Sequence, residues 1–177
     1  MHESKRIESS FYVEGYATTF GKYLLYEYDG YKIYEEIMPN AFDNADMSDI
    51  VMQYNHKGRV IARTSNKTLG VEVDSQGLFM YADLSKSNRG IELYNDIKEG
   101  LITKMSWAFT VDDLDFLELS EYERLYQIKR IKRIYDVSAV SMPANDNTNI
   151  QARLIKLTKP AILKRKLNLL IDIAGKI

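Results

Sequence analysis

Cysteine is absent from this sequence of 177 residues, and proline is scarce, with only three. A chain without cysteine has no disulfide, no thiolate metal site and no cysteine nucleophile. Only two histidines occur, and one of them, His56, lies inside the expected fold, which argues against a histidine-rich zinc site. We therefore expect no thiolate or histidine-rich metal site, and the serine chemistry considered below needs neither a metal ion nor an organic cofactor.

An excess of charge and a long apolar run are also missing. The 24 basic and 25 acidic residues leave a net charge of −1, which provides no global field for nucleic acid or a membrane surface. No apolar stretch approaches transmembrane length, and no signal region follows the charged N-terminus. We expect a soluble protein that acts where it is made and binds neither nucleic acid nor membrane.

What the sequence does contain favours a strand-rich domain. The hydrophobic content of 45% suffices for one core. The chain also has thirteen tyrosines, a residue type that is enriched in β-strands. Alternation and turn residues predict strands over residues 11–20 (with a bulge at Gly15), 50–56, 68–73, 78–84, 101–111 and 125–140, and a hairpin over 23–38 around Asp29-Gly30. This pattern indicates a small β-barrel or a compact α+β domain.

The remaining segments are predicted as follows. Ser85 or Ser87 can cap a helix that runs to about residue 99, and residues 39–42 form a short helix or turn. The acidic stretch 112–123 reads as a loop, and a slip in apolar parity between Ile128 and Ile131 predicts a bulge or two shorter strands. We divide the chain into a flexible N-terminus (1–10), a main domain (11–153) and a basic aliphatic tail (154–177) that resembles an amphipathic helix.

Three polar side chains interrupt or end the predicted strands: His56, Ser106 and Asp136. A base, a hydroxyl nucleophile and an orienting acid are the parts that acyl transfer needs, in any chain order. Each also has a simpler interpretation: a half-exposed strand serine, a surface histidine, and an acid paired with a neighbouring cation (Lys132 or Arg133).

Two alternatives remain open at this level. Lys104, two positions before Ser106, offers a rival base if burial lowers its pKa. The basic run 129–133 could contact phosphates in a small nucleic-acid-binding barrel, although a solvated strand face that offsets the acidic stretch explains it as well.

Taken in order, the segments of residues 10–153 resemble the prohead (procapsid) maturation proteases of tailed phages. The matching features are Glu14-Gly15-Tyr16-Ala17, Phe20-Gly21, Glu36-Ile37-Met38-Pro39-Asn40-Ala41-Phe42, Asn55-His56, Gly77-Leu78, Gly100-Leu101-Ile102, Met105-Ser106-Trp107-Ala108-Phe109, Asp136-Val137-Ser138-Ala139-Val140, Pro143-Ala144 and Thr148. The resemblance rests on the order and spacing of these features more than on any single motif.

The resemblance implies a fold similar to herpesvirus assemblin: a closed antiparallel β-barrel with peripheral helices. It implies a serine endopeptidase that cleaves scaffold or scaffold-like capsid segments, and often itself, inside the procapsid in the host cytoplasm. His56 would be the base, Ser106 the nucleophile and Asp136 the third member, where the family frequently has glutamate. The expected partners are capsid protein and scaffold, with a homodimer suggested by assemblin; the alternative is a catalytically silent barrel that binds scaffold as an assembly module.

Overall fold

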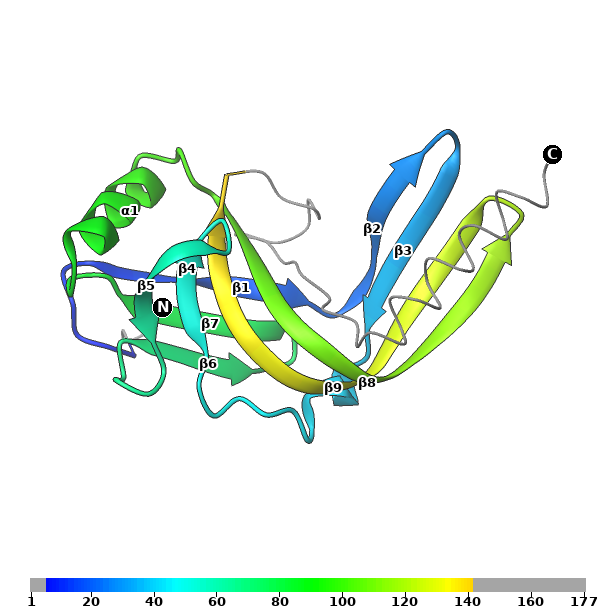
Figure 1. Cartoon of the computed structure of the whole chain (residues 1–177), viewed down its shortest axis with the longest axis horizontal. Coiled ribbons are helices and arrows are strands. Elements are labelled where there is room, and N and C mark those ends of the chain that lie inside the picture. Colours follow the sequence, from blue (N-terminus) through cyan, green and yellow to red (C-terminus); the bar gives the residue numbers. More distant parts are fainter. Residues whose placement is uncertain (1–5, 142–177) are drawn as a thin grey trace.

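The computed structural model describes residues 6–141, which form nine strands, one α-helix at one end of the molecule and one short 3-10 helix (Figure 1). The elements are β1 (Tyr12–Thr19), β2 (Gly21–Tyr28), β3 (Tyr31–Ile37), η1 (Pro39–Phe42), β4 (Val51–Tyr54), β5 (Lys57–Arg63), β6 (Leu69–Val73), β7 (Gly77–Asp83), α1 (Asn88–Lys98), β8 (Lys104–Ser120) and β9 (Glu123–Val140). Within residues 6–141 no helix is both long and apolar enough to cross a membrane.

The strands form two sheets. A three-stranded sheet has the order β1-β7-β6, and a six-stranded sheet has the order β2-β3-β9-β4-β5 with β8 also paired to β9. β3 and β4 run parallel to the two halves of β9, so the larger sheet is mixed. The β-rich α+β class is confirmed. The predicted closed antiparallel barrel is not found in residues 6–141, where the ladders form two sheets, one of them mixed, and where α1 is the one α-helix.

The core lies between the two sheets and consists of apolar side chains that alternate along their strands. On β8, Met105, Trp107 and Phe109 are at most 1% exposed, as the alternation predicts, and the rings of Trp107 and Phe109 stack. On β9, Ile134 and Val137 are fully buried. Burial of this face turns the intervening side chains of both strands to the opposite side of the sheet.

Four strands extend beyond this body as an arm, which we define as residues 21–37 and 112–130. It contains the β2–β3 hairpin and the far end of the β8–β9 hairpin, joined where β3 pairs with β9 (Figure 1). The predicted Asp29-Gly30 turn is confirmed, because both residues have positive φ (49° and 80°) between the paired Tyr28 and Tyr31.

The prediction of a loop at residues 112–123 is wrong, because β8 continues to Ser120. The acidic side chains face cations across the ladder: Lys129 pairs with Asp115 at 3.0 Å, and Arg130 with Asp112 at 2.9 Å. The charged residues of this stretch therefore belong to a strand and pair with the neighbouring strand β9. The basic run serves as the expected solvated strand face that offsets the acidic residues.

Other local predictions have mixed outcomes. The helix is confirmed, with Ser87 as its N-cap accepting from the amide of Gly90 at 3.0 Å. A register shift between Ile128 and Ile131 confirms the slip in β9, which stays one strand.

The bulge predicted at Gly15 is wrong: Gly15 is paired, and the register of β1 shifts at Ala17 instead. The domain boundaries stay predictions, and residues 142–177 lie outside the described residues.

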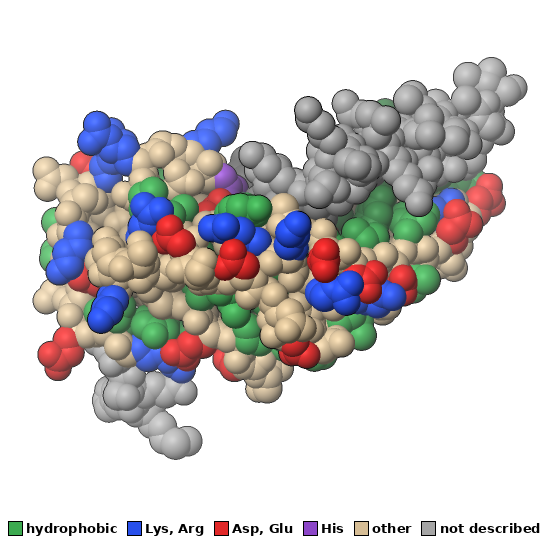
Figure 2. Space-filling model, turned by 60° about the horizontal axis from the view of Figure 1, so that its bottom comes forward, with side chains coloured by type: hydrophobic (Ala, Val, Ile, Leu, Met, Phe, Trp, Pro, Cys, Tyr) green, Lys and Arg blue, Asp and Glu red, His purple; other side chains and the backbone are tan. Residues whose placement is uncertain are grey.

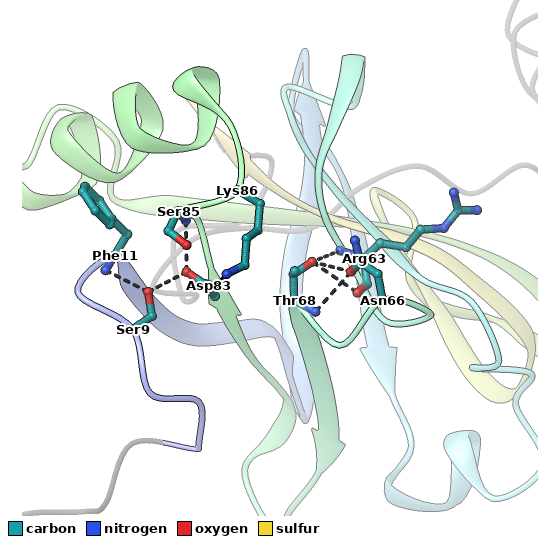
Figure 3. A network of polar contacts seen from close by, with 8 residues as sticks. All are labelled: Ser9, Phe11, Arg63, Asn66, Thr68, Asp83, Ser85 and Lys86. Carbon is teal, nitrogen blue, oxygen red and sulfur yellow. Dashed lines mark hydrogen bonds and ion pairs between the residues drawn. The ribbon is translucent and has the colours of Figure 1, made fainter.

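A buried carboxylate ties the end of β7 to the N-terminal segment and to the start of α1 (Figure 3). Asp83 accepts hydrogen bonds from the Ser9 hydroxyl and from the Ser85 amide, and pairs with Lys86 at 3.1 Å. Burial alone would raise the pKa of Asp83, but the hydrogen bonds from these three residues lower it to about 2. A separate cluster in the same figure closes the β5–β6 turn, where Thr68 and Asn66 bond to each other and Thr68 accepts from the Arg63 amide.

Candidate active site

Ser106 lies near the start of β8 on the side opposite the core residues Met105 and Trp107. It is only 4% exposed, so the simpler interpretation as a half-exposed strand serine is wrong. The ladder places it directly across from Ser138 of β9, which in turn lies across from Gln53 of β4. A row of three polar side chains thus crosses three neighbouring strands on one face of the sheet.

Asp136 lies two residues before Ser138 on β9 and therefore on the same face. Its carboxylate is 7% exposed and accepts a hydrogen bond from the Ser138 hydroxyl at 2.7 Å. The alternative pairing with Arg133 is not observed, because Arg133 pairs with Asp46 instead, at 3.3 Å. Asp136 is therefore directed toward the polar row and not toward the basic run.

His56 lies in the turn between β4 and β5, two residues after β4 ends at Tyr54, and the prediction that it belongs to the strand 50–56 is wrong. Tyr54 pairs with Lys57, and the two residues between them, Asn55 and His56, both have positive φ (51° and 56°). Two consecutive left-handed residues are the pattern of a type I′ hairpin turn. Asparagine and histidine tolerate this backbone better than most residues, so the sequence can bend sharply here and still present an imidazole.

Hydrogen bonds on both sides attach this turn to the rest of the sheet. The Asn55 amide donates to the Ala139 carbonyl at 2.9 Å. The Asn55 side chain donates to the Ser141 hydroxyl at 3.1 Å and accepts from the Ser141 amide at 3.0 Å. Gln53 donates to the carbonyl of Gly58 at 2.9 Å, across the base of the turn. The position of His56 is therefore determined by the end of β9 as well as by its own hairpin.

The structure brings His56, Ser106 and Asp136 into one chain of contacts. The Nδ1 atom of His56 lies 2.9 and 3.1 Å from the two carboxylate oxygens of Asp136, and its Nε2 atom is in hydrogen-bond contact with Ser106 Oγ. Because an ionised carboxylate only accepts, Nδ1–H donates to Asp136 and Nε2 is left to accept from the serine hydroxyl. The side chain of His56 is 14% exposed, so these contacts lie largely out of water.

This arrangement can activate a hydroxyl nucleophile. The imidazole has its basic nitrogen on Ser106 and its other nitrogen oriented by an acid, as the triad mechanism requires. Lys104 shares the β8 face of Ser106, but the observed ring contact favours histidine as the base. Among the described residues no group of three or more histidine, cysteine, aspartate or glutamate side chains could hold a metal ion.

Sequence reasoning did not identify the residues that support the three side chains. Asn55 and Gln53 hold the turn, and Ser138 contacts the acid. The spacing of Asp136 and Ser138 in an apolar strand is a signal that could have pointed to Ser138. Nothing comparable in the sequence indicates the contact between Asn55 and Ser141, which are 86 positions apart.

Comparison with known proteins gives one match. The model of a family described as caudovirus prohead serine protease matches residues 2–161. A search of curated proteins and a search of solved structures each found no match. The matched range contains all three residues of the contact chain.

Proposed function

Because the chain belongs to the caudovirus prohead serine protease family, we propose that it is an active serine endopeptidase with Ser106, His56 and Asp136 as its catalytic residues. The observation that carries this proposal is the continuous contact from Ser106 Oγ through the His56 ring to Asp136. The three residues come from β8, the β4–β5 turn and β9, so only the folded chain assembles them.

The reaction would begin with attack of Ser106 Oγ on the scissile carbonyl carbon. The hydroxyl proton passes to His56 Nε2, and Asp136 stabilises the imidazolium through Nδ1–H. When the C–N bond breaks, Nε2 returns this proton to the leaving amine and an ester to Ser106 remains. Water then attacks the ester carbonyl, gives a proton to Nε2, and Ser106 leaves with that proton restored.

Family membership implies a place within the procapsid and interaction with capsid or scaffold proteins. More specifically, we propose that the substrate is a flexible scaffold or scaffold-like segment of the capsid protein, and that the chain also cuts itself. An extended segment can enter by pairing with a strand edge. Confinement in a shell raises the effective concentration of enzyme and substrate, so activity would depend on assembly.

The test is co-expression of the chain with its own capsid and scaffold proteins, as wild type and as Ser106→Ala. Mass spectrometry of the assembled shells reports which chains have been shortened. We expect cleavage in the wild type and intact chains in the variant. Intact chains in both would support the catalytically silent assembly module instead, although the contact between Ser106 and His56 counts against that module.

A further inference from the structure

The arm presents an apolar face that no other described element covers. Cross-strand register places Tyr23, Tyr26, Ile33, Phe116 and Tyr126 on this face, which we name the aromatic face. Glu35 lies among them and accepts a hydrogen bond from the Tyr23 hydroxyl. Phe116 and Tyr126 contact each other with ring centroids 5.1 Å apart. Tyr26 is 54% and Phe116 is 43% exposed, whereas Tyr23 is buried, at 5%. The aromatic face is continuous with the hydrophobic core, because Ile33 and Tyr126 pack against core residues.

An apolar sheet face normally packs against a second layer. Within residues 6–141 the arm is one sheet deep, and α1 lies at the other end of the molecule (Figure 1). Figure 2 shows this end as a narrow extension with hydrophobic side chains and with acidic and basic ones along its rim. A stable arrangement therefore calls for a further element on the aromatic face.

Charge indicates which element fits. The arm carries ten acidic and five basic side chains, a net charge of −5: Glu27, Asp29, Glu35, Glu36, Asp112, Asp113, Asp115, Glu118, Glu121 and Glu123 against Lys22, Lys32, Arg124, Lys129 and Arg130. Residues 154–177 carry six basic side chains and one acidic one, a net charge of +5: Lys156, Lys159, Lys164, Arg165, Lys166 and Lys176 against Asp172. The two segments have equal and opposite net charge in a chain that is nearly neutral overall.

The apolar pattern of the tail also suits a sheet face. Behind Pro160, Leu163, Leu167 and Leu170 recur at helical spacing, and Lys164 and Asn168 lie between them on the other side. A helix with this stripe can place leucines on aromatic side chains and lysines over the acidic rim. We propose that residues 161–173 bind the aromatic face of the arm within the same molecule.

The chain is long enough for this contact. β9 runs from the arm at Glu123 to its end at Val140, beside the candidate site. The path back from Val140 to Tyr126 is about 46 Å along the strand, at roughly 3.3 Å per residue. Residues 142–160 can span up to about 60 Å when extended. A tether of this length gives the tail an effective concentration in the millimolar range, which favours its own arm over that of a second copy.

The absence of cysteine makes disulfide trapping a direct test. In the full chain with Ser106→Ala, which prevents any self-cleavage, Phe116→Cys is combined with Leu167→Cys and oxidised. The matched control combines Leu117→Cys with Leu167→Cys, since Leu117 is 39% exposed but lies on the opposite side of the same strand. We expect an intramolecular disulfide in the Phe116→Cys variant and about tenfold less of it in the Leu117→Cys variant. Residue 116 lies on the aromatic face, where the tethered tail binds, and residue 117 lies on the other side of the sheet.

Equal trapping at the two positions, or no trapping at either, overturns the proposal. A disulfide that links two chains also overturns it and assigns the face to a second copy. Hydrogen exchange provides a measurement that needs no cysteine: Leu167→Asp combined with Leu170→Asp should accelerate amide exchange in residues 21–37 and 112–130 but not in β6 and β7. Neither readout depends on proteolysis, so failure here is distinguishable from failure of the proposed protease function.

Discussion

The two ends of the β8–β9 ladder use polar side chains in opposite ways. Near the body, Ser106 and Asp136 are buried under the β4–β5 turn and contact His56. In the arm, Lys129 and Asp115 are joined at 3.0 Å while roughly two fifths of each side chain stays exposed (39% and 46%). The same two strands therefore produce a preorganised site at one end and a solvated charge ladder at the other. The β4–β5 turn packs over the first end and excludes water, whereas the charged side chains of the arm stay in contact with water.

The largest expected effect comes from removing the nucleophile at the buried end. Ser106→Ala should reduce cleavage of co-expressed capsid and scaffold proteins by a factor of about 10⁴ or more, because it removes the hydroxyl that contacts the base. Ser120→Ala, at the arm end of β8, is the matched control and should cleave like wild type. Mass spectrometry of the shells measures both. Cleavage that persists in Ser106→Ala would show that the nucleophile lies elsewhere.

The acid provides the next comparison on the same ladder. Asp136→Asn should lower the cleavage rate by about 10³ to 10⁴, because an amide can donate to Nδ1 and so favours the wrong imidazole tautomer. Asp115→Asn removes an exposed carboxylate from the arm and should leave the rate unchanged. Timed cleavage assays on assembled shells compare the two variants. Equal rates for Asp136→Asn and Asp115→Asn would exclude an orienting role for Asp136.

The two type I′ turns of the molecule allow the anchor of His56 to be tested. Asn55→Gly keeps the left-handed backbone but removes the side-chain contacts with Ser141. We expect a loss of about 10¹ to 10² in cleavage rate from misplacement of the ring. Asp29→Gly makes the same change at the equivalent position of the arm turn, where φ is 49°, and should have no effect.

The NMR chemical shifts of the His56 ring, measured at one fixed pH, provide a readout for Asn55→Gly that does not depend on cleavage. Only His2 and His56 contribute imidazole signals, so the assignment is direct. In Asn55→Gly the ring signals of His56 should move, because the turn loses its side-chain bonds to Ser141, while in Asp29→Gly they should match wild type. Unchanged signals together with an unchanged rate would remove Asn55 from the positioning residues.

Acid stability sharpens the contrast between buried and exposed carboxylates. The pKa of Asp83 is lowered to about 2, so its contribution is present above its unfolded pKa near 4 and is lost as the pH falls from about 4 to 2. This contribution is about 2 to 3 kcal/mol. Asp83→Asn should lower the free energy of unfolding at pH 7 but have little effect at pH 2. Urea unfolding at the two pH values measures this, and an equal loss at both would contradict it.

The smallest effect is expected at the exposed end of the ladder. Lys129→Ala breaks a half-exposed ion pair with Asp115, and such pairs are largely screened by water and salt. The urea midpoint of the variant should equal that of wild type at physiological salt. A clear loss of stability would mean that the arm is covered more completely than residues 6–141 show.

Much of the local structure could be predicted because it depends on neighbours in sequence. The Asp29-Gly30 turn needs residues that accept positive φ, and the Ser87 cap needs a hydroxyl three positions before an orphan amide. The acidic stretch 112–123 could not be assigned from its own composition, because the cations that make it a strand belong to β9. The parallel pairing of β9 with β3 and β4 could not be predicted from the sequence either, because it joins segments that are far apart in the chain.

The sequence by itself determined which residues could perform acyl transfer, because it contains a single histidine within the expected fold and no cysteine. Only the tertiary structure decided that His56, Ser106 and Asp136 meet, since their contacts span 50 and 80 positions along the chain. It also decided that His56 lies in a turn and not on a strand, and that Asn55 and Ser138 support the site. The physical reason is that hydrogen-bond geometry depends on how strands pair and which faces are buried, and those are properties of the whole sheet.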